Sequence, residues 1–140
     1  MAVLAADQLT KVLLVSRLHP GDSRPLLTPI LHLTYVQNTG AAFGLFKGQQ
    51  AIVIAISLAV IGWIIWEFRR PFAHVAPAGW WGAGLVLGGA VGNLIDRLRL
   101  GYVIDFIDLR VWPVFNLGDS AITIGVALLI LATLRPARRR

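Results

Sequence analysis

The chain of 140 residues (15.2 kDa) is 56% hydrophobic and only 14% charged, with a mean hydropathy of +0.71. This balance excludes an ordinary soluble domain, in which about a quarter of the residues are charged, and intrinsic disorder, which requires low hydrophobicity. The net charge of +6 does not indicate a nucleic-acid-binding protein, because four of the 13 basic residues lie in the last six positions and no basic stripe interleaved with aromatics runs through the chain.

The first segment, residues 1–18, is apolar but carries Asp7, Lys11 and Arg17. It is therefore either a membrane helix with functional charges or an altered signal peptide. A signal peptide carries its charges before an uncharged apolar core, and here that order is reversed. The segment is better explained as a helix in which Asp7 and Lys11, at positions i and i+4, share one face and form a buried ion pair.

Three further segments approach or reach the roughly 20 apolar residues that cross a bilayer. Residues 48–66 contain no charge, and the only titratable group in 71–95 is a histidine. The predicted spans, after the first at about 1–18, are 48–67, 77–98 and 117–134. We therefore predict a mainly α membrane protein with four transmembrane helices in one domain over 1–140. Glycines at four-residue intervals in the third span, Gly84, Gly88 and Gly92, are typical of close helix packing.

Four spans place both termini on the same side of the membrane, and the basic residues indicate which side. The short turn 68–76 and the tail 135–140 are rich in arginine, so the positive-inside rule predicts that they are cytoplasmic. The longer polar segments, 19–47 and 99–116, are then extracytoplasmic.

Polar side chains beside membrane spans are candidates for function, because they are costly to keep there. Most of them gather at one end of the predicted bundle: Asn93, Asp96, Arg97, Asp105, Asp108, Asn116 and Asp119. No Ser has a His or Lys placed to activate it and no Cys exists, so the carboxylates are the plausible catalysts. Two neighbouring carboxyls share a proton, and one can then act as base while the other acts as acid.

Spacing alone does not choose the pair, although the chain returns to one membrane face at Asp105 and again at Asp119. Structural roles stay open beside the catalytic ones. Asp119 could cap the last helix, and Asp96 beside Arg97 could be an interfacial ion pair. Asp105 could be a strand-edge or turn residue, and its apolar neighbours would raise its pKa by desolvation. Asn38 could only form a turn, or it could hold a substrate backbone.

Two other functions remain open at this point. In a small transporter or proton-channel subunit, Asp7, Lys11, Asp96 and Asp105 would form a relay through the bundle. That function predicts polar residues at all membrane depths, whereas most of these residues gather at one face. A purely structural assembly subunit does not explain why so many Asp and Asn residues accompany the spans. Neither a metal nor another cofactor is expected, because Cys is absent and His19, His32 and His74 have no ligand spacing.

Four stretches together resemble the motifs of bacterial lipoprotein signal peptidase, also called signal peptidase II: ADQLTK, VQNTGAAFGLF, GGAVGNLIDRLRLGYVIDF and FNLGDSAITIG. They cover all four predicted spans in the order of the family. The resemblance implies four transmembrane helices and a small extracytoplasmic β-cradle, which we expect at residues 31–46. It also implies an aspartic endopeptidase of the bacterial inner membrane with its active site at the outer face.

The family removes signal peptides from diacylglyceryl-modified prolipoproteins just before the modified Cys. By resemblance, the catalytic pair is Asp105 and Asp119, and the supporting or substrate-binding residues are Asn38, Asn93, Asp96, Arg97, Asn116, Asp7 and Lys11. The implied partners are this substrate and membrane lipid, with no metal and no obligate protein partner, and the implied inhibitor is globomycin. Gly118 replaces a family Ala, which we expect to reduce rigidity at Asp119. Only six residues precede Asp7, fewer than is usual in the family, so we expect the first helix to depend on its neighbours or to lack an upstream stretch.

Overall fold

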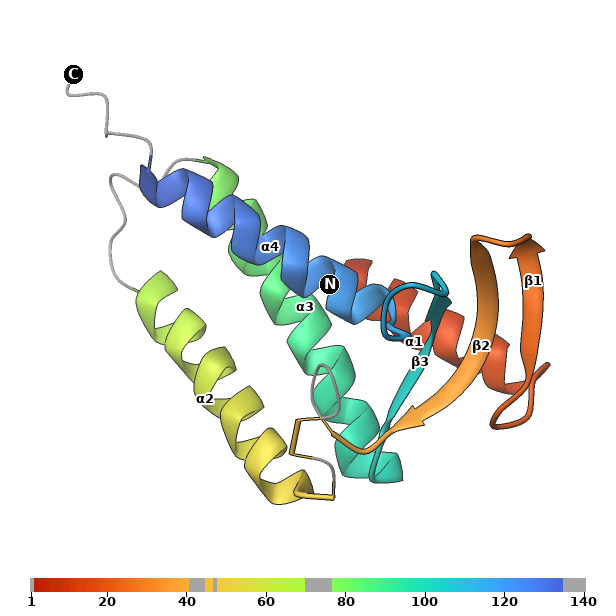
Figure 1. Cartoon of the computed structure of the whole chain (residues 1–140). Helices are drawn as coiled ribbons and strands as arrows, with labels where there is room; N and C mark the ends of the chain where they lie inside the picture. The colour runs from red at the N-terminus through yellow and green to blue at the C-terminus, as the bar shows by residue number, and fades with distance from the viewer. Residues whose placement is uncertain (1, 41–44, 47, 70–76, 135–140) are drawn as a thin grey trace.

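The computed structural model describes residues 2–40, 45–46, 48–69 and 77–134. Within them lie four helices and one small antiparallel sheet (Figure 1), so the prediction of a mainly helical protein with a small sheet is confirmed. The tail 135–140 and most of the turn 68–76, on which the predicted orientation depends, lie outside the described residues. In chain order the elements are α1 Ala2–Val15, β1 Ser23–Leu27, β2 Leu31–Asn38, α2 Gln50–Phe68, α3 Pro77–Leu100, β3 Val103–Asp108 and α4 Leu117–Leu134.

Three of the described helices, α2, α3 and α4, are long and apolar enough to cross a membrane. Only 11% of the residues in the apolar window of α2 and 17% in that of α4 are buried by the rest of the chain, against 50% for α3. The central helix α3 contacts each of the other three (Figure 1). The 14 residues of α1 span about 21 Å, less than the roughly 30 Å of a hydrocarbon core, so its role as a fourth span stays a prediction.

Close contact between α3 and α4 depends on glycines that face one another. A Cβ on Gly82 would lie 2.7 Å from the carbonyl oxygen of Gly125, and a Cβ on Gly125 would lie 2.6 Å from that of Gly82. Two helical turns further along α3, a Cβ on Gly89 would overlap the carbonyl oxygen of Gly118. The two backbones therefore touch, and the start of α4 is held against the C-terminal half of α3.

The predicted glycine stripe of α3 packs only in part. A Cβ on Gly88 would lie 3.0 Å from the Val3 side chain, and one on Gly92 would lie 2.6 Å from Oδ2 of Asp7. Both positions therefore let α1 approach α3. The prediction is wrong for Gly84, where an added Cβ would meet none of the described atoms within 4 Å.

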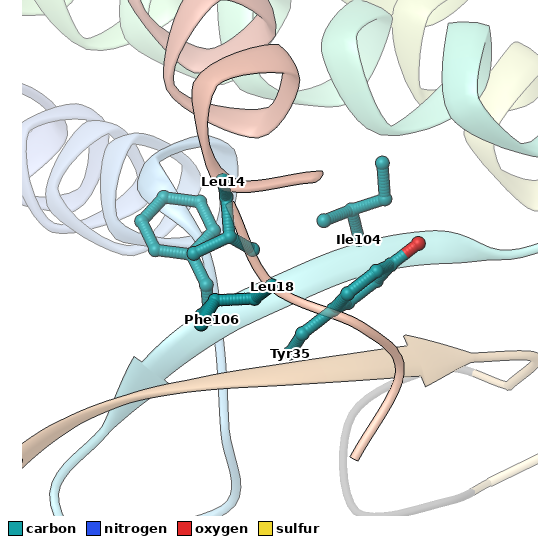
Figure 2. Close-up of a cluster of buried hydrophobic side chains, with 5 residues drawn as sticks. All are labelled: Leu14, Leu18, Tyr35, Ile104 and Phe106. Atoms are coloured by element: carbon teal, nitrogen blue, oxygen red, sulfur yellow. The ribbon is translucent and has the colours of Figure 1, made fainter. Parts of the chain in front are cut away.

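The sheet has the order β1-β2-β3, with β2 in the centre and both pairings antiparallel. The strand expected in 31–46 is β2, which ends at Asn38; residues 41–44 of the expected segment lie outside the described part. Five buried apolar side chains join the end of α1 to the sheet (Figure 2): Leu14, Leu18, Tyr35, Ile104 and Phe106. This cluster holds β2 and β3 against the end of α1.

Candidate active site

Asp105 lies in the middle of β3, and its side chain is only 1% exposed. The register places it opposite Val36 of β2, so the end of β2 lies beside its carboxyl. There Asn38 donates from Nδ2 to Oδ2 of Asp105 at 2.8 Å. From the other side, Asn116 donates from Nδ2 to Oδ1 of Asp105 at 2.7 Å. Each carboxyl oxygen of Asp105 thus accepts from a side-chain amide.

The surroundings raise the pKa of Asp105 to about 7. Burial is the largest cause, because it removes water from the charged form, and the negative charge of Asp119 adds to it. The hydrogen bonds from Asn38 and Asn116 act in the opposite direction but do not outweigh these two effects. Asp105 can therefore hold a proton near neutral pH.

Asp119 lies in the first turn of α4, where it forms a capping box with Asn116. The backbone N–H of Asp119 donates to Oδ1 of Asn116 at 2.9 Å, and the backbone N–H of Asn116 donates to Oδ2 of Asp119 at 3.3 Å. Asp119 therefore takes part in capping α4, as one structural interpretation of the sequence proposed, although Asn116 is the residue at the N-cap position. The other oxygen of Asp119 accepts from Nδ2 of Asn93 on α3 at 2.8 Å.

Two asparagines connect the carboxyl groups of Asp105 and Asp119. Asn93 and Asn116 are both buried, at 5% and 0% exposure. Asn116 donates from Nδ2 to Asp105 and also to Oδ1 of Asn93 at 3.1 Å, while Asn93 donates from its Nδ2 to Asp119. Each amide therefore has a fixed orientation, with its donor side toward a carboxyl group.

A buried charged cluster lies behind these amides. The predicted pair of Asp7 and Lys11 is confirmed, with 2.7 Å between Nζ and Oδ2. The same ammonium lies 2.8 Å from Oδ2 of Asp96 and donates to Oδ1 of Asn93 at 3.0 Å. Asp7 also accepts from the backbone N–H of Gly118 at 2.9 Å. Buried charges are tolerated when they are paired and hydrogen-bonded, and this cluster connects α1, α3 and the start of α4.

The interpretation of Asp96 and Arg97 as an ion pair with each other is wrong. Successive helical residues point about 100° apart, so Asp96 faces Lys11 while Arg97 faces the sheet side. Arg97 donates from Nη2 to the carbonyl oxygen of Gly40 at 2.9 Å and from Nη1 to that of Asn93 at 3.4 Å. It therefore ties the residues after β2 to the end of α3.

Asn38 forms the turn that its sequence context suggests and also contacts Asp105, while its role in holding a substrate backbone stays a prediction. Its Oδ1 accepts from the backbone N–H of Gly40 at 2.9 Å, which forms a local turn, while its Nδ2 donates to Asp105. The turn thus fixes the amide that holds the carboxyl group.

The carboxyls of Asp105 and Asp119 line one cavity of about 1010 Å³. Asn38 and Arg97 line it too, and its other walls include apolar side chains from the 109–115 loop and from α4, among them Trp112, Phe115 and Ile124. Within the described ranges, no group of three or more His, Cys, Asp or Glu side chains is placed to hold a metal. The arrangement can position a water molecule and an extended chain against two carboxyl groups.

The predicted site residues thus occupy three connected layers. Asn38, Arg97, Asp105 and Asp119 line the cavity, Asn93 and Asn116 lie behind the two carboxyls, and Asp7, Lys11 and Asp96 form the buried charged cluster. Sequence reasoning missed Gln8, whose Nε2 donates to Oδ1 of Asp96 at 3.0 Å and to the carbonyl oxygen of Gly92 at 3.2 Å. Its place inside the ADQLTK stretch was the available signal.

Fold and site together define a helical membrane enzyme with a carboxyl-lined cavity, and solved structures agree with this class. Two structures described as a bacterial membrane enzyme have TM-scores of 0.86 and 0.84 to this chain, with 33% and 32% identity. The first match covers 94% of this chain and 82% of the other, and the second covers 96% and 89%.

Sequence comparison gives the family. The family model described as signal peptidase (SPase) II matches residues 1–135. The lipoprotein signal peptidase of Halothermothrix orenii is 44% identical over 132 residues, which cover 94% of this chain and 89% of that protein. That of Moorella thermoacetica is 45% identical over 142 residues, which cover 98% and 91%. The chain belongs to the signal peptidase II family.

Proposed function

We propose that this protein is an intramembrane aspartic endopeptidase that removes the signal peptide from diacylglyceryl-modified prolipoproteins, cutting just before the modified Cys. Family membership supports a peptidase of this kind. The observation that carries the aspartic mechanism is the meeting of Asp105 and Asp119 on one cavity, with Asn93 and Asn116 bridging them.

In the proposed reaction the two carboxyl groups share one proton. Asp105 holds it, because its pKa lies near 7, and Asp119 is the base. Asp119 takes a proton from a water molecule in the cavity as the water oxygen attacks the scissile carbonyl carbon, while Asp105 donates its proton to the carbonyl oxygen. The tetrahedral intermediate collapses when the C–N bond breaks, the amine leaves with the proton held by Asp119, and Asp105 recovers its proton from the intermediate's hydroxyl.

The amides and the guanidinium are assigned to positioning. Asn38 and Asn116 hold the Asp105 carboxyl from both sides, and Asn93 holds Asp119. Arg97 lines the cavity while it donates to the main-chain carbonyl of Gly40, so it is placed to donate to carbonyl oxygens of an extended substrate as well. Asp7, Lys11 and Asp96 keep the amides oriented from behind.

The apolar walls of the cavity fit a substrate that remains partly in lipid. α4 lines the cavity and also exposes large apolar side chains, such as Ile124 at 56%. A diacylglyceryl group can thus stay in the bilayer while the peptide enters from the side. With four spans and cytoplasmic arginine-rich ends, the cavity opens at the outer face of the bacterial inner membrane.

A gel-shift assay on purified protein in detergent tests this proposal. Wild type, Asp105→Asn and Asp119→Asn are offered a diacylglyceryl-modified prolipoprotein and its unmodified form. Asp108→Asn is the matched control, because Asp108 lies on the same strand but does not line the cavity. We expect wild type and the control to cleave only the lipid-modified substrate and both dyad variants to be inactive. Substantial turnover by folded Asp105→Asn or Asp119→Asn would exclude the aspartic mechanism.

A further inference from the structure

A second cavity of about 310 Å³ lies between the end of α1 and the sheet. Apolar side chains such as Leu13, Leu33 and Phe106 line it, together with the side chains of Arg17 and Arg24. We call it the Arg17–Arg24 pocket. It shares no lining residue with the cavity of Asp105 and Asp119, and the proposed peptidase reaction does not use it.

The fold brings the two arginines to the pocket from different elements. Helical hydrogen bonding continues past α1, because the N–H groups of Arg17 and Leu18 both donate to the Leu14 carbonyl at 2.9 Å. Arg17 therefore keeps a place on the helix face. Arg24 of β1 is paired with Leu33 of β2, and paired residues point to the same face of a sheet. Leu33 packs against the apolar cluster beneath α1, so Arg24 is on the face of the sheet toward α1.

Neither arginine forms an ion pair with another residue in the part of the chain that the structure describes. The nearest carboxylate in sequence, Asp22, accepts from the backbone N–H of His19 at 2.8 Å. His19 is the main cause that lowers the pKa of Asp22, and the attraction of Arg24 contributes least. Both arginine side chains are exposed. Two like charges around one small pocket repel each other, and a bound anion would remove that repulsion.

An apolar stripe leads along α1 to this pocket. Leu9 and Leu13 are 60% and 47% exposed, and they precede Arg17 by eight and four residues, so all three share one helix face. Leu13 also lines the pocket. In a membrane protein such a face lies against acyl chains, and here it ends at two guanidinium groups.

We propose that the Arg17–Arg24 pocket binds an anionic phospholipid, with the phosphate between the guanidinium groups and an acyl chain along Leu9 and Leu13. Guanidinium groups bind phosphate oxygens in bidentate fashion, and an anionic phospholipid carries such a phosphate next to its acyl chains. The diacylglyceryl group of the proposed substrate is uncharged, so it does not match this site. The inference therefore stands independently of the peptidase assignment.

Native mass spectrometry tests the site with the full chain in micelles that contain equal amounts of phosphatidylglycerol and phosphatidylcholine of the same acyl composition. We expect wild type to retain phosphatidylglycerol with a preference of roughly tenfold, and Arg17→Gln/Arg24→Gln to retain both lipids equally. Arg69→Gln is the control, since it removes an exposed arginine at the far end of α2 (Figure 1) and should keep the preference.

Three results would overturn the proposal. Wild type could retain the two lipids equally, or the double variant could keep the wild-type preference. Excess inorganic phosphate could also release phosphatidylglycerol completely, which would indicate a site for a free anion, because the apolar stripe would then contribute nothing. Equal thermal midpoints of wild type and the double variant show that a lost preference does not come from unfolding.

Discussion

Replacing Asp105 by Asn should change how stability depends on pH. The folded protein raises the pKa of this carboxyl from 3.8 to about 7, through burial first and the charge of Asp119 second. A carboxyl whose pKa is raised on folding leaves the protein most stable below the unfolded value. That stability is then lost as pH rises from 3.8 to the folded value, and above about 7 nothing more is lost.

The size of the effect follows from the same shift. Between pH 5 and pH 8 the wild type crosses the upper two pH units of this window, up to about 7. At about 1.4 kcal/mol per unit, it should lose about 3 kcal/mol of unfolding free energy that Asp105→Asn does not lose. The new amide also places N–H groups against Asn38 or Asn116, which costs about 1–3 kcal/mol at every pH. Comparison of the two pH dependences removes this constant.

The assay is thermal unfolding in detergent, followed by the fluorescence of the five tryptophans. The difference corresponds to about 10 °C in midpoint between pH 5 and pH 8. Asp108→Asn is the control: burial acts to raise the pKa of Asp108, but hydrogen bonds from Thr34 and Arg110 outweigh it and the net shift is downward. Asp108 therefore stays ionised across this range. Parallel midpoint curves for wild type and Asp105→Asn would refute the argument.

Three further predictions follow from the site and the helix contacts. The initial cleavage rate should fall about tenfold per unit above pH 7, because Asp105 loses its proton; a constant rate up to pH 9 would contradict this. Gly89→Ala should abolish folded protein in size-exclusion chromatography, because the new Cβ would overlap the backbone of α4, whereas Gly84→Ala should fold normally; equal yields would exclude the proposed backbone contact. Lys11→Met should lower the free energy of unfolding by about 3–5 kcal/mol, because it leaves two buried carboxylates without their cation; an unchanged thermal midpoint would show that this cation does not stabilise the fold.

Long apolar runs made the membrane helices predictable, because a bilayer imposes length and hydrophobicity on each segment. The strands gave less signal. β1 is exposed along its whole length, and β3 is buried on both faces, with a single half-buried position at Ile107. Neither strand can therefore show the alternation that marks one buried face. Only β2, which carries the alternating HLTYV stretch, could be located in advance.

Within the site, the sequence predicted contacts between residues that lie close together along the chain. The contact between Asp7 and Lys11 follows from i, i+4 spacing on a helix. The contact between Lys11 and Asp96 depends on how α1 packs against α3, and no local spacing encodes that packing. The sequence therefore suggests an ion pair between Asp96 and its neighbour Arg97 instead. The choice of Asp105 and Asp119 among the carboxylates came from motif resemblance, and their catalytic roles stay predictions.

The hydrogen bond from the backbone of Gly118 to Asp7 joins residues that are 111 positions apart. On the ribosome, these two residues are therefore made at opposite ends of synthesis. Asp7 and Lys11 emerge first and can neutralise each other within one helix, long before Asp96 or Gly118 exists. Asp119 is made with the last helix, so the carboxyl groups of Asp105 and Asp119 cannot meet before that helix exists. The cavity that Asp105 and Asp119 line can therefore form only after the last helix has been made.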